Sequence, residues 1–388
     1  MSLQTFLDAK PLYYKEIDHQ RVHDAYCLLK PHISRPRTVH IVGTNGKGST
    51  GRILAHLACK SGLKVGHYTS PHIIRFNERI WIDGEDASDA VLEEAHQKLH
   101  AILGQEMSEA LSYFEYTTLL AFVVFERCDL MVLEAGLGGE FDATNVCDKE
   151  LSIVTPIGID HQAFLGQSIE AIATTKINSI QKQVVLSAQP FEAVVDVAKK
   201  IAEEKGAVLF LNTLFRAGHQ ALMEEVQKIA ESQSCGAYLV ENAMVALEAL
   251  DILGVDYDID DLKRVKLFGR FYPFRENIRI DVGHNPLAAQ AIVKAMEPET
   301  VLIYNSLDDK DYETVLRTLK PKVKRVEIIQ IHSQRATTLD EIEKALDNTG
   351  LVYRYYDGTV ESDEHYLVFG SFYVVEEFLK SMESHVSE

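Results

Sequence analysis

TVHIVGTNGKGST, residues 38–50, is the stretch that decides the fold of this chain. Its first five residues predict a short buried strand, and the glycines that follow predict a tight turn into a helix. Such a turn directs backbone N–H groups at an anion, and the helix adds the positive end of its dipole. We expect Lys47 to contact a triphosphate, and the hydroxyls of Ser49 and Thr50 to contact phosphate or Mg²⁺. A glycine-rich turn without a ligand is the alternative, because the spacing of the first glycines is shorter than in the usual Walker motif.

The composition is that of an ordinary globular protein. With 388 residues, the chain is too long for one core and predicts two or three domains. The hydrophobic fraction is 46%, the charged fraction is 25% and the formal net charge is −19. A broad nucleic-acid or anionic-membrane surface would need a basic face. We therefore expect neither nucleic acid nor membrane as a partner, and any polyanionic ligand must be bound by a local site.

The cysteines and the first residues bear on location. The five cysteines form no CxxC pair, and reduced thiols are expected; they are Cys27, Cys59, Cys128, Cys147 and Cys235. The first ten residues, MSLQTFLDAK, lack the pattern of a secretory signal, and no apolar run is long enough to span a membrane. We expect a cytoplasmic protein that acts as a monomer.

Strands and helices alternate along the chain. Strands at Thr38–Val42 and Val65–Thr69 flank a helix at Arg52–Ser61, and such a βαβ unit predicts a parallel α/β sheet. We expect a P-loop-type doubly wound ATPase domain with a helical N-terminal segment over residues 1–270. A smaller Rossmann-like α/β domain follows over residues 271–388. Residues 79–84 are expected to leave the first sheet, and residues 268–276 to form the linker between the domains.

Two further strands lead into residues suited to binding a metal or a phosphate. The apolar run Asp129–Glu134 ends in an acid, and the strand at Leu151–Ile157 leads to His161. Open α/β sheets bind their ligands at the carboxyl ends of their strands, where a Walker-B-type acid binds Mg²⁺. A carboxylate that only reaches water, and a structural histidine, are the alternatives.

Several motifs together resemble the folylpolyglutamate synthase and dihydrofolate synthase family, within the Mur-type ATP-dependent amide ligases. The three that carry the resemblance are GTNGKGST at 43–50, TSPH with RFNERI at 69–80, and EAGLGGEFDATN at 134–145. Shorter matches follow at 241–243, 269–270, 281–286 and 369–373. The resemblance implies ATP- and Mg²⁺-dependent addition of L-glutamate to dihydropteroate, to reduced folate or to both, through an acyl phosphate.

The resemblance also implies roles for particular residues. ATP would be bound by Gly43, Thr44, Asn45, Gly46, Lys47, Gly48, Ser49, Thr50, Asn242, Arg270, Asp281 and His284. Two Mg²⁺ sites would be formed by Ser70, Glu134 and His161, with Glu134 between them. Lys176 matches a lysine that the family carries as a carbamate, so Lys47, His161 and Lys176 are the expected catalytic residues. The pteroate side would be lined by Phe114, Glu115, Tyr116, Thr117, Phe141, Asp142 and Ala143.

The chain departs from the family at a few positions. Thr175 precedes Lys176 where a glutamate is usual, and Ile177-Asn178-Ser179 follows it in place of Ala-Gly-Ile. Glu140 stands where an arginine is usual, and Phe268 where a proline is usual. Two alternatives stay open: a non-catalytic nucleotide-binding homologue, and another Mur-type amide ligase.

Overall fold

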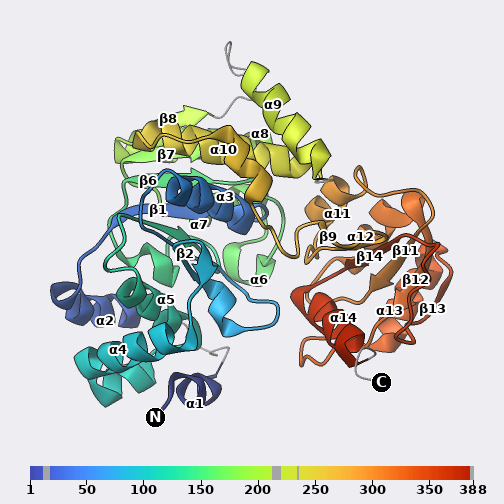
Figure 1. The fold of residues 1–388 in the computed structure, drawn as a ribbon, viewed down its shortest axis with the longest axis horizontal. Coiled ribbons are helices and arrows are strands. Elements are labelled where there is room, and N and C mark those ends of the chain that lie inside the picture. Colours follow the sequence, from blue (N-terminus) through green and yellow to red (C-terminus); the bar gives the residue numbers. More distant parts are fainter. Residues whose placement is uncertain (12–17, 212–219, 234–235, 385–388) are drawn as a thin grey trace. The chain divides into compact units, whose positions relative to one another are not determined.

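The computed structural model describes the chain except for residues 12–17, 212–219, 234–235 and 385–388 (Figure 1). Cys235 lies outside the described residues. The chain divides into two compact units. The first comprises Met1–His219 and Asn242–Val265, and the second comprises Gln220–Glu241 and Lys266–Glu388. One of the three points where the chain passes between the units, Glu241 to Asn242, lies within helix α10 (Ala237–Leu253).

An eight-stranded sheet forms the centre of the first unit. Its order is β4-β3-β2-β5-β1-β6-β7-β8. The strands are β1 (Arg37–Val42), β2 (Val65–Tyr68), β3 (Ile80–Ile82), β4 (Glu85–Asp86), β5 (Leu130–Glu134), β6 (Leu151–Val154), β7 (Gln183–Leu186) and β8 (Val208–Leu211). The strands from β2 to β8 in this order are parallel, which confirms the expected α/β sheet.

One expectation about this sheet is wrong. The segment at residues 79–84 does not leave the sheet, because β3 pairs antiparallel with β2 and then with β4. Ile80 and Trp81 are buried there. Three strand residues are too few to show an alternating pattern, so the sequence gives no strand signal.

Helices flank the first sheet. They are α1 (Leu3–Asp8), α2 (Arg21–Leu29), α3 (Lys47–Lys60), α4 (Asp89–Ala110), α5 (Tyr113–Val124), α6 (Gln162–Leu165), α7 (Ile169–Ile177) and α8 (Glu192–Lys205), followed by α10. One apolar cluster joins α2, α4 and α5 to Tyr68, Met131 and Leu133. Another joins α7 and α8 to Val42 and Val154. Since burial of apolar surface dominates stability, these clusters fix the helices against the strands.

A six-stranded sheet forms the centre of the second unit, in the order β13-β12-β11-β14-β10-β9. The strands are β9 (Tyr272–Arg275), β10 (Ile278–Ile280), β11 (Thr300–Tyr304), β12 (Val323–Ile328), β13 (Tyr353–Tyr355) and β14 (Tyr366–Phe369). The helices are α9 (Gln220–Ser232), α11 (Pro286–Ile292), α12 (Tyr312–Leu319), α13 (Leu339–Thr349) and α14 (Phe372–Ser384). Residues 272–275, expected in a linker, instead form an antiparallel edge strand. Pro273 has no N–H to donate. An edge strand tolerates this because it pairs with a neighbouring strand on one side only.

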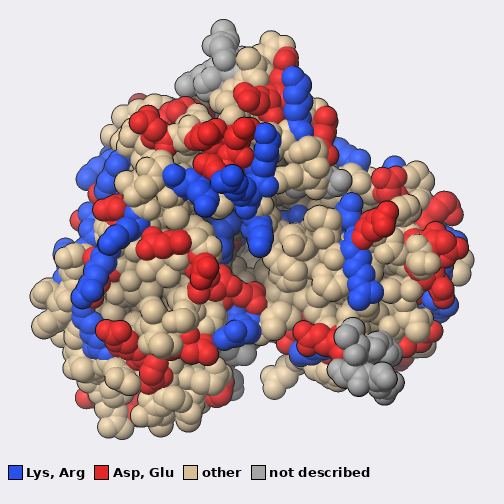
Figure 2. All heavy atoms as spheres, in the orientation of Figure 1, with Lys and Arg blue, Asp and Glu red and all other residues tan. Residues whose placement is uncertain are grey.

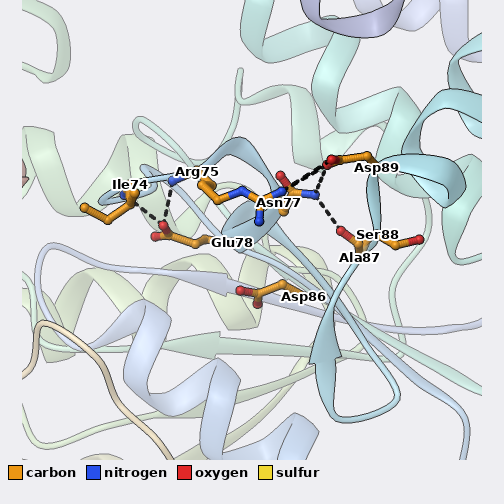
Figure 3. Close-up of a pocket in the computed structure, with 8 residues that line it drawn as sticks. All are labelled: Ile74, Arg75, Asn77, Glu78, Asp86, Ala87, Ser88 and Asp89. Atoms are coloured by element: carbon orange, nitrogen blue, oxygen red, sulfur yellow. Dashed lines mark hydrogen bonds and ion pairs between the residues drawn. The ribbon is translucent and has the colours of Figure 1, made fainter.

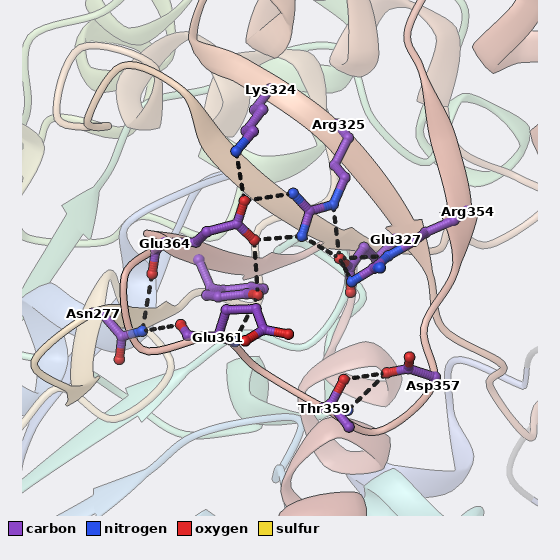
Figure 4. A network of polar contacts seen from close by, with 10 residues as sticks. Asn277, Lys324, Arg325, Glu327, Arg354, Asp357, Thr359, Glu361 and Glu364 are labelled. Carbon is purple, nitrogen blue, oxygen red and sulfur yellow. Dashed lines mark hydrogen bonds and ion pairs between the residues drawn. The ribbon is translucent and has the colours of Figure 1, made fainter.

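A network of charged side chains stabilises one side of the second sheet (Figure 4). Glu327 on β12 is completely buried, and its Oε1 accepts a hydrogen bond from Arg354 Nη2 at 2.7 Å. Glu364 Oε1 accepts hydrogen bonds from Arg325 Nη1 at 2.7 Å and from Lys324 Nζ at 2.6 Å. The hydrogen bond from Arg325 is the main reason that the pKa of Glu364 falls to about 2. Opposite charges on neighbouring strands thus fix β12 and β13 to the end of the sheet.

Two observations bear on the expected partners. Lys and Arg side chains are interspersed with Asp and Glu over the face that Figure 2 shows. No helix in the described part of the chain combines the length and the apolarity that crossing a bilayer requires.

The sheet order determines where a ligand site can form in the first unit. Strands β2, β5, β1 and β6 are neighbours and parallel, so their carboxyl ends meet along one edge. The segments that follow these strands include the glycine loop, Ser70, Glu134 and His161. The fold therefore places the expected metal ligands and the phosphate loop at the same edge of the sheet.

Candidate active site

The glycine loop between β1 and α3 requires its glycines. A Cβ at Gly43 would lie 2.0 Å from the Thr155 hydroxyl, and a Cβ at Gly46 would lie 2.6 Å from Asn242 Oδ1. Gly46 has a φ of 87°, which other residues rarely adopt. Helix α3 begins at Lys47 with no side-chain cap, so no capping oxygen competes with a ligand for its first N–H groups.

Fewer backbone N–H groups of this loop are available to an anion than the sequence predicts. The backbone N–H groups of Thr44 and Asn45 donate to Pro156 O at 2.9 and 3.2 Å, and do not point at a common anion. The donors left for a phosphate are those of the first turn of α3. The N–H groups at the N-terminus of α3 are therefore more available to an anion than those of Thr44 and Asn45.

Lys47 lies beside the acid at the end of β5. Its Nζ donates to the carbonyl oxygens of Gly43 and Thr44 at 3.3 and 3.2 Å, and lies 3.9 Å from Glu134 Oε1. Glu134 is buried, with 4% of its surface exposed. Its second oxygen, Oε2, accepts a hydrogen bond from the Thr69 hydroxyl. A lysine and a carboxylate therefore meet where the glycine loop ends.

Lys176 reaches the same loop from the end of α7. It is buried, and its Nζ donates to Gly43 O at 2.9 Å. Burial, and to a smaller extent the positive charge of Lys47, lower the pKa of Lys176 to about 7. A lysine with this pKa is partly neutral near pH 7, and the neutral amine is the form that can act as a nucleophile.

His161 follows β6 in a strained backbone conformation. Its φ is 51°, which is uncommon for a residue with a side chain. The side chain is one-third exposed, and its Nε2 lies 3.9 Å from Asp160 Oδ2. Strain of this kind is concentrated at functional sites, so the placement supports a ligand role for His161.

Buried polar atoms around the loop lack partners. Ser49 Oγ, Thr50 Oγ1 and Asn242 Nδ2 make no hydrogen bond to the residues that the structure describes. An unsatisfied buried group costs about 1–3 kcal/mol, so a bound ligand is the natural partner for each of them. The atoms include hydroxyl oxygens, which suit phosphate or a hard cation.

The side chains beside the glycine loop offer enough ligands for Mg²⁺ only together with the phosphates of a nucleotide. No group of three or more His, Cys, Asp and Glu side chains suited to a metal occurs among the described residues. Glu134 is a buried carboxylate beside the loop lysine, and its Oε2 also accepts a hydrogen bond from the Ser70 N–H at 3.3 Å. Mg²⁺ is commonly bound by one or two carboxylates plus substrate phosphates. Glu134, the unpaired Ser49 hydroxyl and a triphosphate would meet that requirement.

Comparison with known proteins identifies the family. A scan against models of protein families finds no match. The chain is 31% identical to a dihydrofolate synthase/folylpolyglutamate synthase of Haemophilus influenzae, and the alignment covers 88% of each chain. The chain belongs to the dihydrofolate synthase/folylpolyglutamate synthase family. These enzymes are ATP-dependent ligases that form C–N bonds to glutamate, and this chain is one of them.

Solved structures agree with this assignment. A folylpolyglutamate synthetase of Helicobacter pylori is 39% identical, covers 98% of each chain and superposes with a TM-score of 0.79. A bifunctional folylpolyglutamate synthase/dihydrofolate synthase with Mn, AMPPNP and L-glutamate bound is 25% identical, with a TM-score of 0.82; the match covers 99% of this chain and 98% of the other. The α/β architecture with two sheets is therefore that of the family.

A pocket of about 350 Å³ lies beside the loop that follows β2 (Figure 3). Glu78 on its wall accepts hydrogen bonds from the backbone N–H groups of residues 73–75, at 2.7, 2.8 and 2.7 Å. Asn77 donates to Asp89 Oδ1 and to Ala87 O at 2.7 Å each. Residues of the RFNERI motif thus cross-link this loop, and none of the lining residues belongs to the glycine loop.

Helix α5 carries four of the residues expected on the pteroate side, and three of them are buried. The Tyr116 hydroxyl forms a hydrogen bond of 2.7 Å with His96 Nδ1, and Thr117 is also completely buried. Glu115 caps the start of α5 and pairs with Arg21 at 2.8 Å. In this structure these three side chains contact other protein groups.

The other residues expected on the pteroate side differ in exposure. Phe141 is 56% exposed, and its ring lies 4.4 Å from that of His19. Phe114 is half-buried. Asp142 and Ala143 are buried, and Asp142 Oδ2 accepts a hydrogen bond of 2.8 Å from a backbone N–H of the loop after β5. Phe141 and Phe114 are therefore the members of the set with surface left for a substrate.

The second unit holds the remaining residues of the expected ATP set. Asp281 is buried and accepts hydrogen bonds from two backbone N–H groups at 2.7 Å and from the Tyr238 hydroxyl at 2.9 Å. The Arg270 guanidinium lies 5.5 Å from the centroid of Phe372. His284 Nδ1 donates to a backbone carbonyl at 3.1 Å. Asp281 thus stabilises the loop that carries His284.

Three residues near the site were not predicted as site residues. Thr69 donates to Glu134, Asp160 lies beside His161, and Glu78 organises the loop after β2. Thr69 and Glu78 lie inside the quoted motifs, so the motifs carried a signal for them. Their partners could be identified only from the packed structure.

Proposed function

We propose that this chain binds ATP with Mg²⁺ at the glycine loop and adds L-glutamate to dihydropteroate, to a reduced folate or to both. Lys47 and Lys176 both donate to Gly43 O, and Glu134 lies 3.9 Å from Lys47 Nζ; this arrangement carries the proposal. A related structure that contains Mn, AMPPNP and L-glutamate supports a divalent metal and the two small substrates. Asn242, Arg270, Asp281 and His284 complete the proposed ATP-binding set.

The chemistry begins with activation of the pteroate or folate carboxylate. Joining a carboxylate to an amine is unfavourable at neutral pH, so a carboxylate oxygen first attacks the γ-phosphorus of ATP and ADP leaves. The amine of glutamate then attacks the acyl phosphate, and phosphate departs as the amide forms. Lys47 and the N-terminus of α3 hold the phosphates and offset their charge. Mg²⁺, when bound, supplies further charge neutralisation.

We propose that Ser70, Glu134 and His161 contribute to two Mg²⁺ sites and that Lys176 carries a carbamate. A neutral amine is needed for reaction with CO₂, and the buried position of Lys176 favours that form. The reaction forms one N–C bond and releases one proton. Intact mass under native conditions should show the added CO₂. A Lys176→Ala enzyme with full activity would contradict the role.

Phosphate release tests the proposed function. We expect release with glutamate plus dihydropteroate, with glutamate plus tetrahydrofolate or with both pairs, and little release when the pterin substrate is omitted. Equal release in every mixture would contradict the ligase reaction. We also propose that the enzyme acts as a cytoplasmic monomer. Nucleotide binding without phosphate release in any mixture would also contradict the ligase reaction.

A further inference from the structure

The loop that follows β5 packs against the end of α7 that carries Lys176. A Cβ at Gly139 would lie 2.3 Å from Lys176 O, so only glycine allows this approach. The next residue, Glu140, donates its backbone N–H to Thr175 O at 2.9 Å. The main chains on either side are therefore in direct contact at Lys176.

The Glu140 side chain makes a second connection. Asn178 Nδ2 donates to Glu140 Oε2 at 2.8 Å, and Asn145 Nδ2 donates to Glu140 O at 2.8 Å. Both Glu140 and Asn178 are half-buried. A hydrogen bond to a carboxylate is stronger than one between neutral groups, and partial burial strengthens it further.

A buried lysine reinforces the same junction. Lys149 is 1% exposed, and its Nζ donates to Ser179 O at 2.9 Å and to Asn145 Oδ1. Ser179 Oγ in turn donates to Lys176 O at 2.8 Å. The segment after β5 and the end of α7 are thus joined by several polar contacts around one residue.

These contacts act on Lys176 through its main chain. Among the described residues, the lysine side chain itself makes one hydrogen bond, from Nζ to Gly43 O. A long side chain with one partner depends on its backbone for position. Small displacements of a reacting group can lower a rate strongly.

We infer that Glu140 and Asn178 form a positioning pair that holds Lys176 at the glycine loop. The pair does not contact the reacting atoms and acts through the backbone of residues 175–178. This inference rests on the proposed role of Lys176. It is tested by a readout that does not need ligase activity.

The test measures two quantities in each variant: labelling of Lys176 by an amine-reactive anhydride, and kcat. Labelling is done in CO₂-free buffer, so that Lys176 is a free amine and the proposed carbamate does not itself block the label. The variants are Glu140→Ala, Asn178→Ala, the double variant, Glu140→Gln and Asn178→Asp, with Glu170→Gln on the first turn of α7 as control. We expect Lys176 to be protected in the wild type, the control and Glu140→Gln, because the amide of glutamine still accepts from Asn178. Each alanine variant should expose Lys176 to the label and lower kcat about tenfold at unchanged KM for ATP. The double alanine variant should lose as much protection and kcat as either single alanine variant. Asn178→Asp should lose more than Asn178→Ala, because it places a second carboxylate beside Glu140.

The outcomes separate the inference from the proposed function. Unchanged protection and kcat in both alanine variants would overturn the positioning pair. Independent, additive losses in the double variant would also overturn it. Lost protection with unchanged kcat would support the pair and contradict a catalytic role of Lys176. A wild type without phosphate release would contradict the proposed function, whereas the labelling result would still decide the inference.

Discussion

Lys47 is the residue whose loss should affect catalysis most simply. Its Nζ lies over the glycine loop, 3.9 Å from Glu134 Oε1, and supports no apolar core. Lys47→Ala should lower kcat by roughly 150-fold, the equivalent of about 3 kcal/mol of transition-state stabilisation, with an unchanged circular dichroism spectrum. Lys60→Ala, at the exposed end of the same helix, is the control. A Lys47→Ala enzyme that keeps more than about a tenth of the rate would contradict the triphosphate role.

Lys149 makes stability depend on pH in a defined direction. Burial lowers the pKa of Lys149 from 10.5 to about 8. Between those values the unfolded chain binds the proton and the folded chain does not, so the contribution of this group to stability rises with pH. One proton corresponds to a slope of at most about 1.4 kcal/mol per pH unit. Lys149→Met should be less stable overall and should show a shallower rise from pH 8 to 10.5 in urea unfolding, and an unchanged slope would contradict the assignment.

Helix α7 carries Lys176, so its first turn matters for the site. Ser168 Oγ caps the helix by accepting from Ala171 N at 3.3 Å. Ser168→Ala should destabilise the first unit by about 1 kcal/mol, because a backbone donor loses its partner. Ser168→Asn should restore most of that loss, since asparagine caps equally well. Urea unfolding followed by fluorescence measures both, and equal stability of all three proteins would contradict the capping role.

At the scale of elements, the central strands were predictable and the short edge strands were not. Strands β1, β2 and β5 lie within one residue of their predicted bounds, because each is a short run rich in apolar residues. Strands β3, β4 and β9 were missed, since they have only 3, 2 and 4 residues, too few to show a period. Their pairing depends on tertiary contacts.

The candidate site was predictable by motif but not by contact. The positions of Lys47 and Glu134 at strand ends follow from the strand order and the parallel sheet. The partners of Lys176 do not, because they come from the loop after β5 and from the glycine loop after β1. The departures at Glu140 and Asn178 had no explanation in the sequence, and the structure shows that the two side chains bind each other.

At the scale of the whole molecule, the two compact units carry different parts of the proposed chemistry. The first unit contains the glycine loop, Glu134 and Lys176. The second contains Arg270, Asp281 and His284. We propose a domain boundary between residues 270 and 271. The ATP-binding domain would lie before it and the glutamate ligase domain after it. Contacts divide the chain a few residues earlier and also assign residues 220–241 to the second unit.

Transfer of labelled oxygen tests the central claim most directly. If the pteroate or folate carboxylate attacks ATP, one carboxylate oxygen becomes the bridge to phosphorus and leaves with the phosphate when glutamate attacks. The substrate is dihydropteroate or tetrahydrofolate, labelled with ¹⁸O in the reacting carboxylate, and the released phosphate is analysed by mass spectrometry. We predict one ¹⁸O atom in each phosphate, matched by one new amide bond. Amide formation with unlabelled phosphate would contradict the acyl-phosphate account.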